Sequence, residues 1–359
     1  MKVVVYSFIP SPYQVELFDT LHATGEISLT VIYAAHGVVG TPWSERSLRH
    51  DHRFIDECTS HDIQRETDSG DLVIFSWYRH PGFRDAMRRR SGSGRPWCLW
   101  SERPGFRYTG IAGRLVRKLL LWPLWTRHAP IWAIGKWGIE GYRREFGDRH
   151  LFIDLPYFSN LSRFRAVCNS ERRVPSRVLY VGSLIPRKGL DVLATAWRRT
   201  APRFPAATLS LLGSGVMAQQ VARTLAPVDK GVSLLGPADW DQVPRAYGNA
   251  DILCAPSRYD GWGLIVPEAL ASGLPVVASS SMGASREMLV EGRQGWFAKP
   301  GDAESLEEKL SLALSLSADQ YAAMSKAAQD TALDYDVDEG SHRFTAAAHQ
   351  TVASFRSPS

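Results

Sequence analysis

The densest chemical signal in the sequence is a pair of carboxylates, Asp260 and Glu268, with seven residues between them. They lie in the segment SRYDGWGLIVPEALASGLPVVA, residues 257–278, where Gly261 and Gly263 permit unusual backbone angles and the close approach of a ligand. Two carboxylates would repel a phosphate, but they accept hydrogen bonds from hydroxyl groups. The pattern therefore suits a ligand with hydroxyls on either side of an anionic centre, as in a sugar–diphosphate–nucleoside.

The elements around this pair position it at the end of a strand. The apolar run over 252–255 predicts a buried strand that ends in the glycine-rich loop. A helix is expected from about Leu264 to Ser272, where Gly273 ends it and Pro275 prevents its continuation. Loop amides at the start of a helix form an anion site through their exposed N–H groups and the helix dipole.

A second signal lies upstream, in the segment RVLYVGSLIPRKGLD, residues 177–191. It predicts a strand, then a loop with the adjacent cations Arg187 and Lys188, then a helix. Two cations at this place could neutralise a diphosphate, although they could also be an exposed loop pair. Two further strand-to-glycine turns occur at 211–215 and 232–237, and open α/β sheets bind ligands at the carboxyl ends of their strands.

Strands and helices alternate along the whole chain. The expected strands, many of them continuous apolar runs typical of parallel sheets covered by helices, are 2–9, 28–35, 71–77, 97–101, 130–134, 151–153, 177–181, 208–212, 232–235, 252–255 and 275–278. Because the βαβ rhythm occurs twice, we predict two doubly wound α/β domains, over 1–160 and 161–341. A C-terminal helix within 342–359 is expected to pack back on the first domain.

Composition excludes several other classes. The chain has 359 residues, of which 44% are hydrophobic and 22% charged, so collagen, coiled coil and extended disorder do not fit. The start MKVVVY reads as a strand and not as a signal peptide, which predicts a cytoplasmic location. The four cysteines are scattered without a C-x-x-C pair, so we expect free thiols and no zinc site.

Positive charge gathers in the first half of the chain. Residues 1–165 hold 23 Lys and Arg against 17 Asp and Glu, and residues 84–127 hold 11 against two. Within this stretch, residues 110–125 form a basic amphipathic helix, which either docks on an anionic membrane or packs its apolar side on the core. Peripheral attachment to the inner face of the membrane is one expectation. Nucleic acid is not expected as a partner, because no RNA- or DNA-binding module is present.

Taken together, the motifs resemble those of retaining glycosyltransferases of the GT-B fold, glycosyltransferase family 4 ("glycosyl transferases group 1"). The resemblance covers roughly 177–314, including the motif GASRE at 283–287, whereas the first half matches weakly through Pro10–Tyr13. It implies two Rossmann-like domains that face a central cleft, an acceptor-binding first domain and a donor-binding second domain. It also implies a nucleotide-diphosphate sugar as co-substrate, with no metal and no other cofactor, and a glycan or lipid-linked acceptor.

The resemblance also implies roles for individual residues. Glu268 would bind the ribose hydroxyls, and Asp260 would hold the donor sugar and diphosphate with loop amides. Arg187 and Lys188 would balance charge on the departing diphosphate. The expected substrate-binding residues are Gly182, Ser183, Gly213, Gly215, Leu235, Gly236, Pro237, Gly261, Trp262, Gly263, Leu264, Ile265, Tyr13, His80, Glu102 and Glu287. Retention would proceed by a front-face route in which the leaving phosphate deprotonates the acceptor hydroxyl.

Several of these residues have structural interpretations as well. His80 and Glu102 follow expected strands and could face a ligand or simply be satisfied polar residues at strand ends. Glu287 could contact the donor or pair locally. The family's Gly-Arg pair after the first strand of the second domain is Gly182-Ser183 here, so one cation must come from elsewhere, and Arg187 is the candidate.

Other functions remain open at this point. Another GT-B enzyme, a sugar phosphorylase or a nucleotide-sugar epimerase, would use the same motifs. A non-catalytic nucleotide-sugar or lipid-binding protein would bind the donor without releasing nucleoside diphosphate. A dinucleotide dehydrogenase is disfavoured, because no G-x-G-x-x-G follows an early strand.

Overall fold

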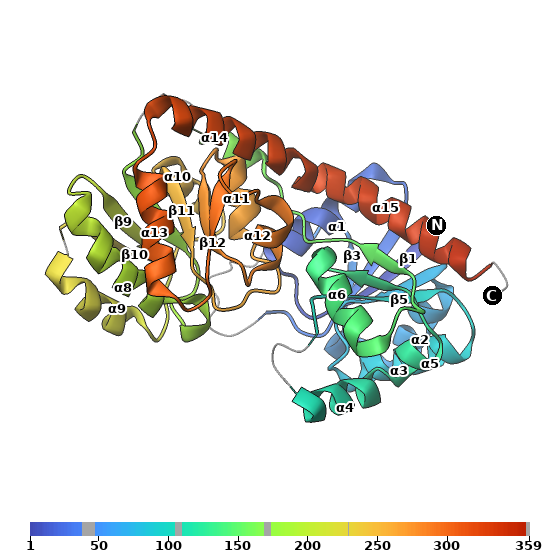
Figure 1. The fold of residues 1–359 in the computed structure, drawn as a ribbon. Helices are drawn as coiled ribbons and strands as arrows, with labels where there is room; N and C mark the ends of the chain where they lie inside the picture. The colour runs from blue at the N-terminus through green and yellow to red at the C-terminus, as the bar shows by residue number, and fades with distance from the viewer. Residues whose placement is uncertain (38–46, 105–109, 169–173, 229, 357–359) are drawn as a thin grey trace. The chain divides into compact units, whose positions relative to one another are not determined.

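The computed structural model describes residues 1–37, 47–104, 110–168, 174–228 and 230–356 (Figure 1). The chain divides into two compact units. Of the described residues, unit 1 takes those up to 160 together with 337–356, and unit 2 takes 161–336. The last helix begins at Val337, five residues before the expected start near 342, and it belongs to unit 1.

Unit 1 is built on a seven-stranded parallel sheet in the order β3-β2-β1-β4-β5-β6-β7. Its strands are β1 (Lys2–Ser7), β2 (Ser28–Tyr33), β3 (Asp51–Phe54), β4 (Leu72–Phe75), β5 (Trp97–Ser101), β6 (Ile131–Ala133) and β7 (Phe152–Asp154). Val3, Val4 and Val5 are all fully buried, as expected for a central strand covered on both faces. The strand order changes direction between β1 and β4.

Helices cover both faces of this sheet. Side chains of α2 (Ser60–Ser69), α3 (Pro81–Gly92), α5 (Trp122–Thr126) and α6 (Gly135–Phe146) share one apolar cluster with the strands. Helices α1 (Pro12–Thr24) and α15 (Val337–Ser354) pack against each other. On α15, Thr351 accepts a hydrogen bond from the Trp132 indole at 2.9 Å, and Phe344 packs edge-on against Trp100. The end of the chain thus completes the core of unit 1.

Unit 2 holds a six-stranded parallel sheet in the order β10-β9-β8-β11-β12-β13. Its strands are β8 (Arg177–Val181), β9 (Thr208–Leu212), β10 (Val232–Gly236), β11 (Ile252–Ala255), β12 (Val276–Ser279) and β13 (Gly295–Ala298). Helices α8 (Leu190–Thr200), α9 (Ala218–Leu225) and α13 (Ala303–Leu314) pack into one core cluster with these strands. Helix α11 (Ile265–Ala271) contacts α7 (Ser162–Arg165) and α14 (Ala318–Ala332).

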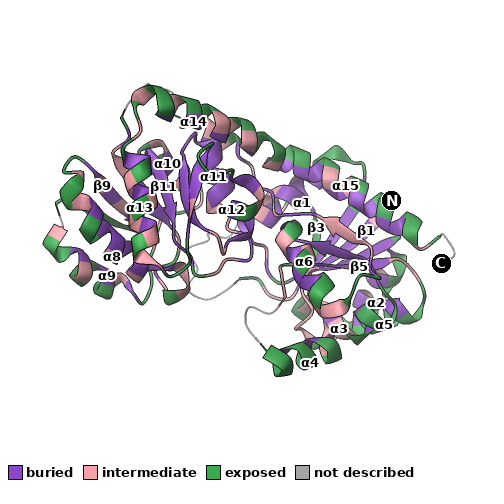
Figure 2. Cartoon of the chain, in the orientation of Figure 1, coloured by how far each residue is buried: buried purple, intermediate pink, exposed green. Residues whose placement is uncertain are grey.

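The prediction of two doubly wound parallel α/β domains is confirmed. All eleven expected strands are present: four have the expected bounds, the others differ by one or two residues at one or both ends, and β3 and β13 are additional. Figure 2 shows buried strands beneath helices whose outer sides are exposed in each unit. Within the described residues, no helix is long and apolar enough to cross a membrane. All four cysteines are free thiols.

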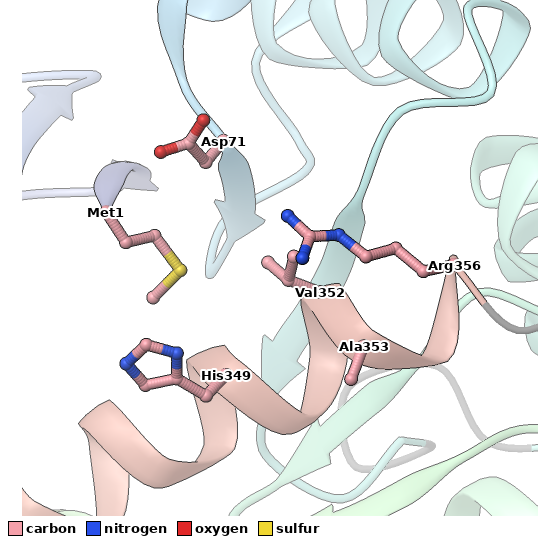
Figure 3. A pocket seen from close by; sticks show the side chains of 6 residues that line it. All are labelled: Met1, Asp71, His349, Val352, Ala353 and Arg356. Atoms are coloured by element: carbon pink, nitrogen blue, oxygen red, sulfur yellow. The ribbon is translucent and has the colours of Figure 1, made fainter.

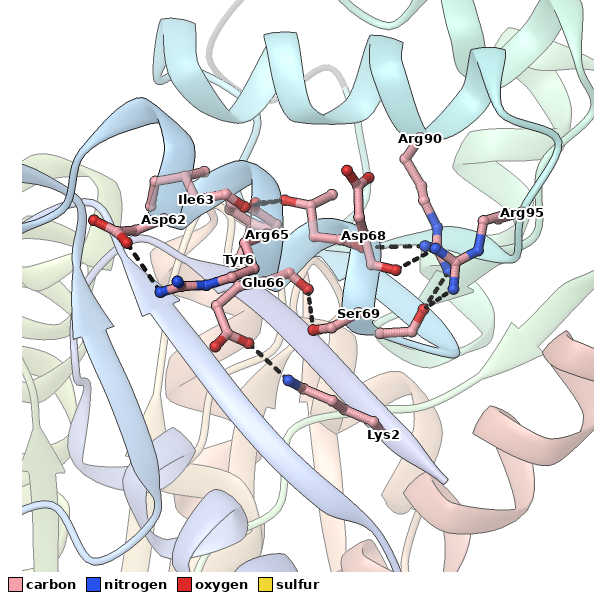
Figure 4. A network of polar contacts seen from close by, with 12 residues as sticks. Lys2, Tyr6, Asp62, Ile63, Arg65, Glu66, Asp68, Ser69, Arg90 and Arg95 are labelled. Carbon is pink, nitrogen blue, oxygen red and sulfur yellow. Dashed lines mark hydrogen bonds and ion pairs between the residues drawn. The ribbon is translucent and has the colours of Figure 1, made fainter.

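One buried cation holds together the amino-terminal edge of the unit 1 sheet (Figure 4). The Arg90 guanidinium, 1% exposed, donates to the backbone carbonyls of Thr67, Gly70, Asp71 and Pro96 at 2.8–3.1 Å. Burial lowers the pKa of Arg90 to about 10, so the side chain stays charged at neutral pH. These bonds tie the end of α2 and the starts of β4 and β5 to helix α3.

We expect Arg90→Met to lower the unfolding free energy by about 3 kcal/mol, because several buried carbonyls lose their donor at once. The matched control is Arg88→Met on the same helix, where Arg88 is 47% exposed and pairs with Asp85. That change should alter stability by about 0.5 kcal/mol or less. Urea denaturation of both variants measures the difference, and equal effects would contradict a structural role for Arg90.

Candidate functional site

The strand order of unit 2 changes direction between β8 and β11, and the loops that follow these two strands meet there. After β8, a short 3-10 turn over Pro186–Lys188 carries Arg187 and Lys188 and ends at Gly189. Gly189 has φ +73°, and a Cβ there would lie 2.1 Å from the Pro256 carbonyl oxygen of the loop after β11. Only glycine permits this approach.

Bonds between the two loops fix the cations beside a carboxylate. The Arg258 amide donates to the Arg187 carbonyl, and the Arg187 guanidinium donates to the Tyr259 carbonyl, both at 2.9 Å. The Lys188 ammonium contacts the Asp260 carboxylate directly, and the Arg187 guanidinium lies 3.7 Å from it. Three of the four expected catalytic residues therefore lie together at the change in strand order, where open α/β sheets place their ligands.

This cluster has an excess of positive charge. Two cations face one carboxylate, and the Lys188 and Asp260 side chains are only 15% and 13% exposed. Because partial burial lowers the effective dielectric constant, the excess attracts an anion more strongly here than on an open surface. An incoming diphosphate could take over the cations from Asp260, which would leave the carboxylate to accept hydrogen bonds from hydroxyl groups.

The loop after β11 is held in shape by the loop after β12. The Asp260 amide donates to the Ser281 carbonyl at 3.0 Å, and Asp260 forms an isolated parallel bridge with Met282. Gly263 has φ +95°, and a Cβ there would lie 2.6 Å from the Met282 methyl carbon and 3.6 Å from the Asp260 carboxyl carbon. Gly263 thus keeps open the space between Asp260 and the start of α11.

The other glycine turns contact one another along the same sheet edge. A Cβ at Gly213 would lie 2.0 Å from the Gly182 carbonyl oxygen, and one at Gly215 would lie 2.5 Å from the Leu184 carbonyl oxygen. The Gly213 amide also donates to the Gly236 carbonyl at 2.8 Å. The turns after β8 and β9 therefore leave no room for a side chain between their backbones, and a backbone hydrogen bond joins the end of β10 to them.

Glu268 occupies a more enclosed place than the cation cluster. It lies on α11, is 2% exposed, and accepts a hydrogen bond from the Tyr247 hydroxyl at 2.8 Å. Tyr247 is fully buried on α10 (Val243–Gly248). Burial raises the pKa of the Tyr247 hydroxyl well above its usual value, and the adjacent Glu268 raises it further, so the hydroxyl stays a donor. Sequence reasoning missed Tyr247, because an aromatic residue on an expected helix is most simply a core residue.

The remaining expected residues of unit 2 divide by exposure. Leu235 and Pro237 are exposed at the end of β10, and Ser183 is exposed after β8. Trp262 is 1% exposed and packs near Tyr335, with ring centroids 6.1 Å apart. Its buried side chain therefore supports the loop after β11. Glu287 is half-buried on α12 (Gly283–Met288), the helix that follows β12.

In unit 1 the structure brings Tyr13 and Glu102 together around a residue that the sequence did not single out. Tyr13 lies in the first turn of α1, Glu102 follows β5, and Tyr157 follows β7. The rings of Tyr13 and Tyr157 are 4.7 Å apart. Burial and then the Glu102 charge raise the pKa of Tyr13 to about 12, and burial also raises that of Tyr157. All three side chains lie at the carboxyl edge of the sheet, as a ligand site requires.

His80 lies in different surroundings. It precedes α3 and lines a cavity of about 250 Å³ whose wall also includes Cys58, Ile63, Asp85 and Arg89. Its Nδ1 atom is buried and has no hydrogen-bond partner among the described residues. The expected site residues of unit 1 therefore fall into two groups, Tyr13 with Glu102 and His80 by itself.

A larger hollow of about 670 Å³ lies at the opposite edge of the unit 1 sheet (Figure 3). Met1 and Asp71, which line it, directly precede β1 and β4, and His349 and Arg356 come from the end of the chain. Parallel sheets bind ligands at their carboxyl edges, so this hollow does not belong to the candidate site. Within the described part of the chain, no group of three or more His, Cys, Asp and Glu side chains could hold a metal ion.

The part of unit 2 that holds these residues matches a known protein family. Residues 175–315 match the family model described as "Glycosyl transferases group 1". This segment contains the cation cluster, the glycine turns and Glu268, so the resemblance to glycosyl transferases group 1 is confirmed over this part of the chain, while the retaining mode stays a prediction.

Curated relatives match mainly over the same part. Mannosylfructose-phosphate synthase of Agrobacterium fabrum is 34% identical over 176 residues, 44% of this chain and 38% of that protein. Phosphatidyl-myo-inositol mannosyltransferase of Mycobacterium leprae is 31% identical over 140 residues, 38% of this chain and 37% of that protein. The chain spans about half the length or less of the curated relatives it matches.

Solved structures match the whole chain at low sequence identity. HepE of Anabaena, solved in complex with UDP, is 16% identical with a TM-score of 0.79, over 98% of this chain and 100% of that chain. A glycosyltransferase of Rickettsia africae is 14% identical with a TM-score of 0.77, over 98% of both chains. The fold class is therefore GT-B, as predicted, while the central cleft stays a prediction.

The buried pair in unit 2 can be tested by a double-mutant cycle. Tyr247→Phe should lower the unfolding free energy by about 1–2 kcal/mol, because Glu268 loses a buried donor. Glu268→Gln should cost less in the Tyr247→Phe background than in the wild type, with a coupling energy of about 1 kcal/mol measured by denaturant unfolding. Strict additivity would show that the charge of Glu268 does not strengthen this hydrogen bond.

Proposed function

We propose that this chain is a retaining, metal-independent glycosyltransferase. It transfers a sugar from a nucleotide-diphosphate sugar to a hydroxyl of a glycan or lipid-linked acceptor. The observation that carries the proposal is the meeting of Arg187, Lys188 and Asp260 where the strand order changes, inside the segment that matches the family. The UDP bound to the structurally similar HepE supports a nucleoside diphosphate as the leaving group.

The two cations supply the electrostatics of this transfer. When the bond between the anomeric carbon and the diphosphate oxygen breaks, both electrons stay on that oxygen, and negative charge grows on the diphosphate. Arg187 and Lys188 are already held by the loops after β8 and β11, so they can stabilise this charge without reorganising. They serve the purpose that a divalent cation serves in other transferases, and this supports metal independence.

Retention follows from the position of the acceptor in the proposed reaction. The acceptor oxygen attacks the anomeric carbon from the face that the diphosphate leaves, and its proton passes to the departing phosphate oxygen. No protein nucleophile is needed. Asp260 then accepts hydrogen bonds from the donor sugar, and Glu268, held by Tyr247, binds the ribose hydroxyls. Leu235, Gly236 and Pro237 at the end of β10 lie near the base in this proposal.

Unit 1 supplies the acceptor side of the proposal. Tyr13, Glu102 and Tyr157 combine two phenolic hydroxyls with one carboxylate, which suits the recognition of sugar hydroxyls. His80 is a further candidate contact. The names of the curated relatives include transferases that act on phosphatidylinositol derivatives, which supports a lipid-linked acceptor and peripheral action at the inner face of the membrane.

The deciding experiment is a transfer assay with a panel of nucleotide sugars. The cognate donor should raise the melting temperature by mass action and release nucleoside diphosphate when acceptor is added. Proton NMR of the product should show the anomeric configuration of the donor. Donor binding without release of nucleoside diphosphate would identify a non-catalytic binding protein, and an inverted product would contradict the front-face route.

The role of the cations predicts a selective loss of affinity. Lys188→Met should weaken the binding of the nucleoside diphosphate by about 10- to 100-fold, the value of one charge-assisted hydrogen bond. Binding of the corresponding monophosphate should change less. The matched control, Lys326→Met, removes the same charge from a lysine of unit 2 that is 72% exposed. Isothermal titration calorimetry measures the affinities of the wild type and both variants for both nucleotides, and equal losses for the two nucleotides in Lys188→Met would refute a diphosphate contact.

A further inference from the structure

Helix α4 (Gly110–Leu120) turns its apolar side outward. Ile111, Leu115 and Leu119 recur every four residues, which places them along one stripe of the helix. Their exposed fractions are 78%, 57% and 72%. We call these three residues the apolar stripe. Figure 2 draws almost all of α4 in the exposed colour, so the core-packing hypothesis for this helix is wrong.

The opposite side of α4 holds a buried cation. The Arg117 guanidinium donates to both carboxylate oxygens of Glu145 on α6, at 2.7 and 2.9 Å, and the two side chains are 8% and 5% exposed. Gly113, one turn earlier, is also buried. Turning the apolar stripe inward would expose Arg117 and leave Glu145 buried without this partner, at a large cost. The ion pair therefore fixes the outward orientation.

Cations lie beside the apolar stripe. Arg114, Lys118 and Arg127 are exposed, and residues 110–127 contain no Asp or Glu. The exposed indoles of Trp122 and Trp125 continue the surface on α5. Residues 105–109, which precede the helix and belong to the basic stretch 84–127, lie outside the described residues. An apolar stripe with flanking cations and indoles is complementary to the boundary between anionic headgroups and acyl chains.

We propose that α4 and the start of α5 form a docking surface that lies on an anionic lipid bilayer, with the apolar stripe inserted below the headgroups. At 11 residues α4 is too short to span the bilayer, so it lies in its plane. The docking surface would place the enzyme beside a lipid-linked acceptor. This connection rests on the proposed function. Its test needs no catalysis, so the two proposals can fail separately.

Co-sedimentation of the full chain with vesicles provides the test. Wild-type protein should bind vesicles of 70% phosphatidylcholine and 30% phosphatidylglycerol, and it should bind pure phosphatidylcholine much less. The variant I111S/L115S/L119S should lose at least about 100-fold in the partition coefficient. R114Q/K118Q should lose about 25-fold, and increasing salt should reduce wild-type binding.

A matched control distinguishes the effect of the apolar stripe on vesicle binding from the effect of removing any three exposed apolar side chains. V290S/L312S/L333S replaces three aliphatic residues of unit 2 that are 54%, 45% and 56% exposed. It should bind vesicles like the wild type. Melting temperatures should be unchanged for all variants, because the replaced side chains are exposed.

Three results would overturn the proposal. The first is undiminished vesicle binding by the stripe variant. The second is equal wild-type binding to neutral and anionic vesicles. The third is a wild-type dimer in sedimentation velocity that becomes monomeric in the stripe variant, since a second copy would then cover the stripe. Loss of donor binding or turnover in the assays above, with vesicle binding intact, would affect only the proposed function.

Discussion

The candidate site depends on the close contact of two backbone loops at the carboxyl edge of the unit 2 sheet. At Gly189 the loop after β8 approaches the Pro256 carbonyl so closely that a Cβ would lie 2.1 Å from it. A side chain here would force the loops apart and break the Arg258–Arg187 backbone bond between them. The contact between Lys188 and Asp260 would be lost with it. Gly189 has no reactive group, but it sets the distance between the Lys188 ammonium and the Asp260 carboxylate.

This constraint explains why unit 2 could be predicted well from the sequence. Strand, glycine turn and helix follow each other locally, and a parallel sheet brings all strand ends to one edge. Arg187, Lys188 and Asp260 could thus be grouped without knowledge of side-chain positions. Tyr247 could not be found in this way. Its hydroxyl matters only because α10 packs beside α11, and no local pattern distinguishes it from an ordinary core aromatic.

The two strands that sequence reasoning missed are both edge strands, and their sequences depart from that of a central strand in different ways. β3 has the sequence DHRF, in which three residues are exposed and none is fully buried. It is an edge strand that pairs with β2 alone in the sheet order. β13, GWFA, begins with glycine and pairs only with β12. A Cβ at its first residue, Gly295, would lie 2.2 Å from the Val276 carbonyl oxygen, so the pairing of β13 with β12 requires glycine at this position. Glycine has a low strand propensity, which weakens the sequence signal of β13.

Unit 1 shows the limit of sequence patterns more clearly. Tyr13, Glu102 and Tyr157 come from three separate strand ends and share no motif, so only the folded sheet groups them. His80, which also follows a strand, lines a cavity against α2 instead. The rule that ligands bind at the carboxyl edge of a parallel sheet predicts where a residue lies, but it does not predict the direction in which its side chain points.

The orientation of α4 shows how one distant contact can decide between two hypotheses. The spacing of Ile111, Leu115 and Leu119 establishes an apolar stripe, but a stripe can face a core or a partner equally well. Burying three such side chains would stabilise unit 1 by several kcal/mol. Breaking a buried ion pair costs about 3–5 kcal/mol, a comparable amount. The outcome therefore depends on Glu145, 28 residues beyond Arg117, which neither the composition nor the periodicity of the helix reveals.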